Sequence, residues 1–198
     1  MTSTIAVEDN NYASESDILN CQFANWYASF EKDTIKSTMI KLTTDFIDYL
    51  KEDGVYIPVK SIYEKDELSD DEELREVSNG DKTSHYELPK YIEEQIASVL
   101  QSSERGVFIK TNWSAPIDAA WLFGGSLKCK RIEEILMLLK SSERVTFDIE
   151  HMFDRCKDSK RKGPDECTLI VRRWADLIPS MEFRVFVSSH NIVGEKAY

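Results

Sequence analysis

Hydrophobic residues recur at helical spacing in two segments in the middle of the chain. In Leu88–Leu100 the apolar residues lie along one stripe, while Glu93 and Glu94 face away from it. Ile132–Lys140 has the same alternation of apolar and charged positions. The spacing therefore predicts two amphipathic helices whose apolar sides pack into a core.

Two more helices are predicted nearer the N-terminus. Aromatic side chains spaced three and four residues apart in Cys21–Phe30 form one face of a helix, which we expect to pack on the main core rather than serve as a binding platform. These aromatic residues are Phe23, Trp26, Tyr27 and Phe30. Further on, Thr43 or Thr44 is suited to cap a helix that Gly54 would end.

Other segments have the composition or alternation of strands. The central one is the apolar run Val107–Ile109, and the others are Thr34–Leu42, Thr168–Trp174 and Glu182–Val187. The last two are expected to be adjacent strands joined by the segment ADLIPSM. Helix followed by strand in this order predicts an α+β sandwich.

The chain end continues this pattern only briefly. His190 and Asn191 suit a tight turn after the last of these strands. Ile192 and Val193 would begin a returning strand, which we expect to have barely started when the chain stops at Tyr198.

Several segments lack the pattern of a regular element. Residues 1–19 are polar and acidic and predict a disordered or loosely docked leader, and Glu64–Glu76 is an acidic run that predicts a mobile loop. Within that run, Ser69 resembles an acidophilic kinase site. Asp158–Glu166 is predicted to be a loop, and Ala119–Leu122 a short helix interrupted by two glycines.

The composition is that of an ordinary folded protein with an excess of acidic residues. Of the 198 residues 41% are hydrophobic and 11% aromatic, and the net charge is −11 with a pI near 4.8. Binding to nucleic acid or to an anionic membrane needs a positive surface, so the charge speaks against both. It is compatible with a protein partner that has a basic face, and equally with a role in solubility alone.

Cysteine usage and hydropathy indicate the compartment. The four cysteines are widely separated and include no C-x-x-C pair: Cys21, Cys129, Cys156 and Cys167. This spacing argues against a zinc site. No secretory signal and no apolar run of membrane-spanning length is visible. We therefore expect a cytoplasmic protein with free thiols.

Cationic residues at strand ends are the candidate chemistry. Lys110 follows the apolar run Val107–Ile109 and precedes a polar loop, and Arg172, Arg173 and Arg184 lie on other predicted strands. A cation that leaves a strand into a loop is well placed to bind phosphate. The alternative is a strand that ends at a solvated lysine.

Longer stretches of the sequence resemble one family. The stretches are CQFANWY, FIKTNWSAPIDAAW, LKC, MLLKSSERV and LIVRRWADLIPSMEFRVFV. Between about Asn20 and Gly194 the chain is similar to the cell-division-cycle protein 123 family, the assembly chaperones of eukaryotic translation initiation factor 2. The resemblance implies ATP and magnesium binding, the factor's gamma subunit as partner, and a contribution to translation initiation and cell cycle progression. It also implies an ATP-grasp-like fold, of which residues 20–194 would be the N-terminal part with an incomplete C-terminal half.

The resemblance also assigns roles to residues. Lys110 would be the first phosphate cation, and Arg184 would reach the phosphates. Beside Lys110, the loop residues would be Asn112, Trp113, Ser114 and Ala115. The strand edge and the hinge beside adenine would be formed by Arg172, Arg173, Trp174 and Ala175. The family's acidic segment that holds magnesium has no counterpart here, and residues 195–198 diverge from the family. We therefore expect a truncated form in which the metal ligands are missing and ATP binds poorly.

Two classes of function follow from these expectations. One is an ATP-binding chaperone, and the other is an ATP-grasp ligase or kinase-like enzyme, unless the chain is an inactive truncated form. No nucleophile or general-base constellation is evident in the sequence, which favours the chaperone.

Overall fold

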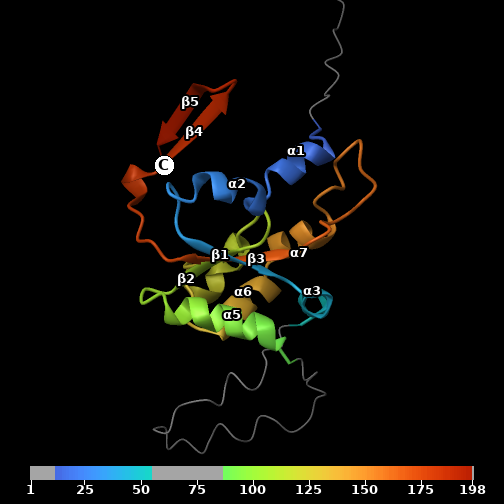
Figure 1. The fold of residues 1–198 in the computed structure, drawn as a ribbon, viewed down its shortest axis with the longest axis vertical. Coiled ribbons are helices and arrows are strands. Elements are labelled where there is room, and N and C mark those ends of the chain that lie inside the picture. Colours follow the sequence, from blue (N-terminus) through green and yellow to red (C-terminus); the bar gives the residue numbers. More distant parts are fainter. Residues whose placement is uncertain (1–11, 55–86, 198) are drawn as a thin grey trace, which may run out of the picture.

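The computed structural model describes residues 12–54 and 87–197. Glu64–Glu76 and Ser69 lie outside the described residues, as does most of the predicted leader. The helices are α1 (Glu15–Asn20), α2 (Phe23–Phe30), α3 (Thr44–Lys51), α5 (Lys90–Gln101), η2 (Ile117–Phe123, 3₁₀), α6 (Ile132–Lys140), α7 (Glu143–Glu150) and η3 (Pro179–Met181, 3₁₀). The strands are β1 (Ser37–Lys41), β2 (Val107–Lys110), β3 (Thr168–Arg173), β4 (Phe183–Ser188) and β5 (Asn191–Ala197). This is a mixed arrangement of helices and antiparallel sheets (Figure 1).

A three-stranded sheet in the order β1-β3-β2 lies at the centre of the described chain. Both neighbours of β3 run antiparallel to it. Because side chains alternate between the two faces of a strand, Leu169 and Val171 point into the main core while Ile170 points to the other face. The main-core face packs against α3, α5 and α6, and the other face is covered in part by α2 (Figure 1).

The predicted amphipathic helices form close to the expected positions. Helix α6 has the predicted bounds, and its residues Ile135, Leu136, Leu138 and Leu139 are buried. At the start of α3, the Thr43 hydroxyl accepts a hydrogen bond from the Phe46 amide, so Thr43 is the cap. The helix ends at Lys51, three residues before the predicted stop at Gly54.

The aromatic face of α2 packs on the sheet as predicted, but only in part. Phe23 and Tyr27 are buried against Ile170, and Trp26 is partly buried beside them. Phe30, at the end of the same helix, is 54% exposed. The three-to-four spacing therefore identifies the helix correctly, although its last aromatic residue lies beyond the edge of the contact.

A short helix forms where the sequence predicts a disordered or loosely docked leader up to Leu19. In α1, Ser14 and Asp17 form a reciprocal capping box, which satisfies amide groups at the helix start. Glu15 pairs with Arg161 at 3.0 Å, across 146 residues of sequence. None of the residues of α1 is buried, so these polar contacts hold the helix in place.

Helix α7 was not predicted from the sequence. Its cap is Ser142, whose hydroxyl accepts from the Val145 amide at 3.3 Å and donates to Asp118 at 2.6 Å. Asp118 belongs to η2, which extends the predicted short helix Ala119–Leu122 at both ends. The start of α7 is therefore held both by its local cap and by a hydrogen bond to a residue distant in the sequence.

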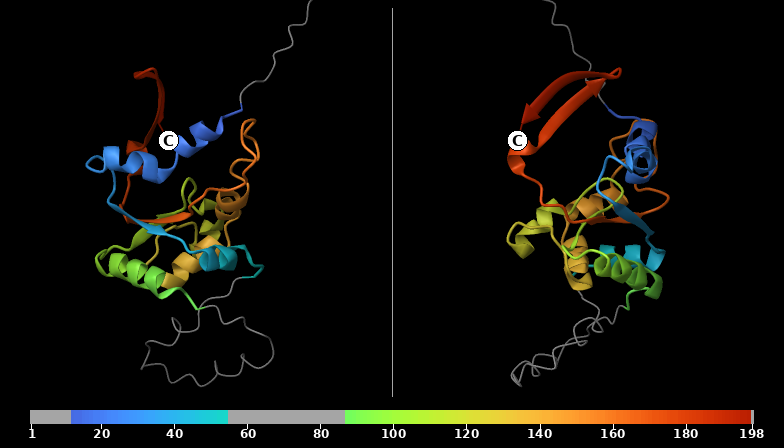
Figure 2. Two further views of the ribbon diagram at one scale, coloured as in Figure 1. Left: turned by 45° about the vertical axis from the view of Figure 1, so that its right-hand side comes forward. Right: turned by 60° about the vertical axis from the view of Figure 1, so that its left-hand side comes forward.

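The two C-terminal strands depart from the expected arrangement. The segment Thr168–Trp174 and the segment Glu182–Val187 do not pair with each other: β3 lies in the central sheet, whereas β4 pairs with β5 in a separate hairpin. Ser189 and His190 adopt positive φ angles of 48° and 64°, which close a tight turn. As a result β5 is a strand of seven residues rather than one that has barely begun. The hairpin projects away from the rest of the described chain (Figure 2).

Candidate functional site

Two of the predicted site cations, Lys110 and Arg172, lie on neighbouring strands and on the same face of the central sheet. Lys110 was predicted to bind phosphate, and Arg172 to lie at the strand edge beside adenine. The Lys110 ammonium nitrogen is 5.6 Å, and the Arg172 guanidinium carbon 5.4 Å, from the centre of the Phe23 ring on α2. An aromatic ring attracts cations through its π face. The Phe23 ring thus contacts two positively charged groups, which lie close to each other.

The surroundings of both cations are poor in negative charge. Lys110 donates to the Trp113 carbonyl oxygen at 2.8 Å. Burial and the nearby charge of Arg172 lower the pKa of Lys110, and Asp148 opposes them. Burial also lowers the pKa of Arg172, with Tyr27 acting in the opposite direction.

Arg172 has an unsatisfied nitrogen within the described part of the chain. One terminal nitrogen donates to the Thr34 hydroxyl at 3.0 Å, but Nε is buried and has no hydrogen-bond partner there. A buried donor without a partner costs free energy. An anionic ligand that accepts from Arg172 would remove this cost and reduce the repulsion between Arg172 and Lys110.

The loop predicted to lie beside Lys110 is built largely from internal hydrogen bonds. The Asn112 side chain donates to the Glu166 carbonyl at 2.8 Å and accepts from the Thr168 amide at 2.6 Å, which joins the loop to the start of β3. The Trp113 indole donates to the Ile18 carbonyl at 2.9 Å in α1. Ala115 packs against the main core.

Sequence reasoning missed the residue that organises this loop, Asp148 of α7. Its buried carboxylate accepts from the Ser114 amide and hydroxyl at 2.8 and 2.7 Å, from the Trp113 amide at 3.2 Å and from the Thr111 hydroxyl. The sequence signal was weak, because an acidic residue within an unpredicted helix looks like an ordinary surface position.

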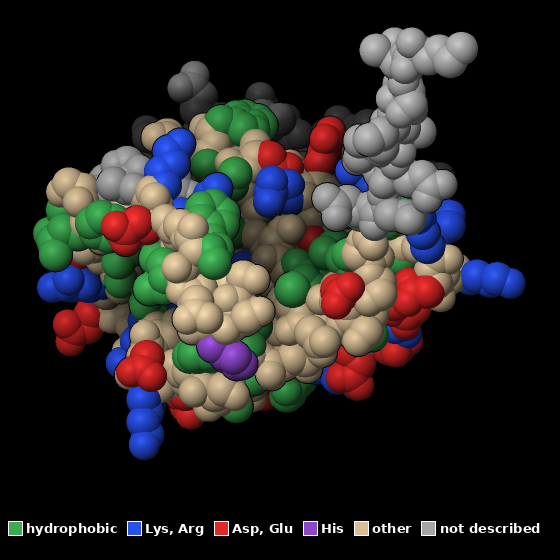
Figure 3. All heavy atoms as spheres, turned by 90° about the horizontal axis from the view of Figure 1, so that it is seen from above, with side chains coloured by type: hydrophobic (Ala, Val, Ile, Leu, Met, Phe, Trp, Pro, Cys, Tyr) green, Lys and Arg blue, Asp and Glu red, His purple; other side chains and the backbone are tan. Residues whose placement is uncertain are grey.

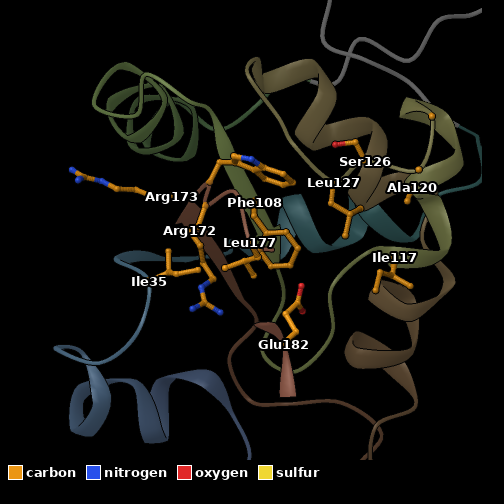
Figure 4. Close-up of a pocket in the computed structure, with 14 residues that line it drawn as sticks. Ile35, Phe108, Ile117, Ala120, Ser126, Leu127, Arg172, Arg173, Leu177 and Glu182 are labelled. Atoms are coloured by element: carbon orange, nitrogen blue, oxygen red, sulfur yellow. The ribbon is translucent and has the colours of Figure 1, made fainter. Parts of the chain in front are cut away.

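A pocket of about 740 Å³ opens beside Arg172. Predicted site residues supply one wall, namely Arg172, Arg173, Trp174 and Ala175. Phe108 and Leu177 lie near its middle, and Glu182 lies below them (Figure 4). The Arg173 side chain points away from the cavity (Figure 4). The remaining wall comes from η2 and the turn after it, which includes Gly124 and Gly125.

The pocket therefore combines an apolar interior with a cation, Arg172, and a carboxylate, Glu182, at its sides. Seen from above, the molecule is hollowed near its centre, and hydrophobic, basic and acidic side chains lie around the hollow (Figure 3). Main-chain groups of the segment Trp174–Leu177 run along the pocket edge, where the Trp174 amide already donates to the Gly106 carbonyl at 3.0 Å. Such an arrangement suits a flat, partly apolar ligand that carries an anionic group.

The other predicted site residues do not line this pocket. Lys110 and its loop lie farther along the sheet face, and Arg184 lies exposed on β4. Within residues 12–54 and 87–197, no group of three histidine, cysteine or acidic side chains is placed to hold a metal ion. Of the helices in those residues, none is both long and apolar enough to span a membrane.

The fold and the site define a mixed α/β protein with paired cations beside an apolar pocket. The sequence model of the D123 family matches residues 26–195, and the chain belongs to this family. The resemblance found in the sequence is thereby confirmed.

Named relatives agree with this assignment. The chain is 37% identical over 91% of its length to the translation initiation factor eIF2 assembly protein of Botryotinia fuckeliana, covering 46% of that protein. To the protein of the same name from Xenopus tropicalis it is 35% identical over 91% of its length, covering 56%. The chain thus spans about half the length of the curated relatives it matches.

A solved structure shares the fold. The structure of Cdc123 from Schizosaccharomyces pombe superimposes with a TM-score of 0.69 at 31% sequence identity. The match covers 93% of this chain and 64% of the other.

Proposed function

We propose that this chain provides the N-terminal, nucleotide-contacting part of an assembly chaperone for eukaryotic translation initiation factor 2. Membership of the D123 family and relatives named as eIF2 assembly proteins support this role. The finer part of the proposal is that the ligand is ATP, that the fold is ATP-grasp-like, and that the partner is the factor's gamma subunit. A contribution to cell cycle progression follows from the same role, and one relative is named cell division cycle protein 123.

The observation that carries nucleotide binding is the buried Nε of Arg172, which lacks a partner in the described chain and lies beside a second cation. Lys110 and Arg172 would hold phosphate oxygens, since charge-assisted hydrogen bonds to phosphate are strong. The base would lie in the pocket between Phe108 and the edge formed by Trp174 and Ala175.

Magnesium fits the described residues less well. ATP normally binds with a divalent cation held by carboxylates, and no such cluster is present in the described ranges. No metal-dependent step follows from these residues. We therefore expect the chain by itself to bind ATP weakly, with the metal ligands supplied by the part of the relatives that this chain does not match.

Calorimetric titration of ATP with magnesium tests the nucleotide site. We expect weak binding by this chain and stronger binding by a version extended with the C-terminal half of a relative. Substituting Lys110→Ala, Arg172→Ala or Arg184→Ala should weaken binding by the extended version at least about tenfold. A matched control is Lys90→Ala, at an exposed cation of α5 that forms an ion pair with Glu94 at 3.8 Å. If the three site variants bind ATP as tightly as the control variant does, the proposed site is excluded.

A binding experiment tests the partner. The extended version should retain the gamma subunit in a pull-down at low salt and less of it at high salt, because the acidic chain is expected to meet a basic face. Steady ATP hydrolysis without retention of the subunit would instead favour an enzyme.

A further inference from the structure

Asp148 is a buried acidic residue whose contacts all lead to the loop around Lys110. It is 2% exposed and belongs to α7. Oδ2 accepts from the amides of Trp113 and Ser114 at 3.2 and 2.8 Å and from the Thr111 hydroxyl. Oδ1 accepts from the Ser114 hydroxyl at 2.7 Å.

A direct path connects this carboxylate to the ammonium group. Asp148 fixes the amide of Trp113, and the carbonyl oxygen of the same residue accepts from Lys110 Nζ at 2.8 Å. The loop geometry that Asp148 imposes thus sets the position of the cation. Without the loop, a lysine with four rotatable side-chain bonds would have many other conformations.

The charge of Asp148 matters as well as its hydrogen bonds. Among the described residues, two charged side chains act on Lys110: Arg172 from β3, which disfavours the ammonium form, and Asp148 from α7, which favours it. The group packed against Lys110 from α2 is the neutral ring of Phe23. Asp148 is therefore the charge that opposes the effects of burial and of Arg172 on Lys110.

We propose that Asp148 is a positioning residue of the candidate anion site, whose carboxylate holds the loop around Lys110 and places a negative charge near the ammonium group beside Arg172. The consequence for ligands rests on the proposed nucleotide function, whereas the effect on Lys110 does not. Asp148 would touch no ligand itself, because its oxygens are occupied by the loop.

Asp148→Asn separates charge from geometry. An asparagine oxygen can accept the same bonds as Oδ2, and its amide can donate to the Ser114 hydroxyl, so the loop is retained while the negative charge is lost. A matched control is Asp118→Asn, which changes an aspartate of η2 that accepts hydrogen bonds from the start of α7 and is not among the groups acting on Lys110.

The primary measurement is the titration of Lys110 by NMR on protein with ¹³C-labelled lysine, without any ligand. We expect the pKa of Lys110 to be lower in Asp148→Asn than in the unmodified protein and unchanged in Asp118→Asn. A second sample of the unmodified protein, with ¹³C-labelled aspartate, provides a second readout, because the carboxyl carbon signal of Asp148 should shift as Lys110 loses its proton. The proposal would be overturned if the pKa of Lys110 were the same in all three proteins. It would also be overturned if the Asp148 carboxyl signal did not change while Lys110 titrates.

Binding of inorganic triphosphate, measured on the version extended with the C-terminal half of a relative, then tests the consequence. Because an uncharged lysine attracts no anion, affinity should fall at a lower pH in Asp148→Asn than in the unmodified protein, and by about tenfold where only the variant has lost the charge. Coincident pH profiles would overturn the link between Asp148 and the site. If triphosphate binds neither protein, the proposed nucleotide function fails, while the ligand-free titration still decides the role of Asp148.

Discussion

At the scale of single residues, burial determines the chemistry of several side chains more than their partners do. Cys129 is fully buried, and this burial, with a smaller effect of Glu134, raises its pKa to about 12. Burial likewise raises the pKa of Cys167 to about 11 and that of Tyr49 to about 12. The unfolded chain has none of this burial, so it loses these protons at lower pH than the folded protein.

The stability contributed by the raised pKa of Cys129 should disappear in alkali. It is fully present below the ordinary thiol pKa of 9.0 and is lost as pH rises from there towards 12, because only the unfolded chain ionises in that window. The free-energy advantage of the unmodified protein over Cys129→Ala should therefore shrink by about 2–3 kcal/mol between pH 8 and 11. Urea unfolding at several pH values measures it. The control Leu138→Ala truncates another buried side chain that carries no proton, and its deficit should stay constant. A constant deficit for Cys129→Ala would show that burial does not shift this thiol.

At the scale of elements, the contact between α2 and the central sheet both stabilises the fold and builds the candidate site. Phe23 stacks on Tyr27 with ring centres 4.9 Å apart, packs on Ile170 and lies beneath both cations. Its amide donates to the Asn112 carbonyl at 2.9 Å, so the start of the helix is also joined to the loop beside Lys110. A change in this helix should therefore affect Lys110 and Arg172, the two cations of the candidate site.

Two phenylalanines of the same helix test this contact. Phe23→Ala should lower the free energy of unfolding by about 3–5 kcal/mol, the usual cost of truncating a buried phenylalanine. Phe30→Ala removes an exposed ring from the helix end and should change it by less than about 0.5 kcal/mol. Urea denaturation followed by tryptophan fluorescence measures both. Similar effects of the two variants would mean that α2 does not pack on the sheet in solution.

At the scale of the whole molecule, the described chain divides into a packed body and a hairpin with little support. The three strands of the central sheet share the main core, whereas every residue of β4 is exposed. Large apolar side chains on the hairpin are open to solvent, including Phe183, Phe186, Val187, Ile192 and Val193. An isolated two-stranded hairpin is marginally stable in water.

Amide hydrogen exchange should follow this division. We expect the hydrogen-bonded amides of β4 and β5 to exchange at least about a hundredfold faster than those of β3, because local opening of the hairpin exposes no core. Mass spectrometry of peptic fragments measures the rates. In the version extended with the C-terminal half of a relative, the hairpin amides should slow, while those of β3 change little. Equal protection of β3 and β4 in this chain would show that the hairpin is supported by contacts other than those described.

Local patterns in the sequence determined most helices and the position of every described strand. The stripe in Ile132–Lys140 predicted α6 with its bounds, and Thr43 was identified among the candidate caps of α3, because both signals lie within a few neighbouring residues. The cations Lys110 and Arg172 were singled out for the same reason, since each follows an apolar run. The family resemblance added Trp174 and Ala175 as expected hinge residues, which no spacing would indicate; in the structure both line the pocket.

Only the tertiary structure decided what those local signals cannot encode. It separated β3 and β4 into different sheets, and it placed Lys110 and Arg172 over one aromatic ring although they are 62 positions apart in the sequence. Asp148 became visible as the organiser of the loop only when α7 was packed beside it, because a buried carboxylate and a surface one look alike in a sequence. The physical reason is common to these cases: alternation and capping are set by neighbouring residues, whereas strand pairing, burial and the partners of a charge depend on segments that folding brings together.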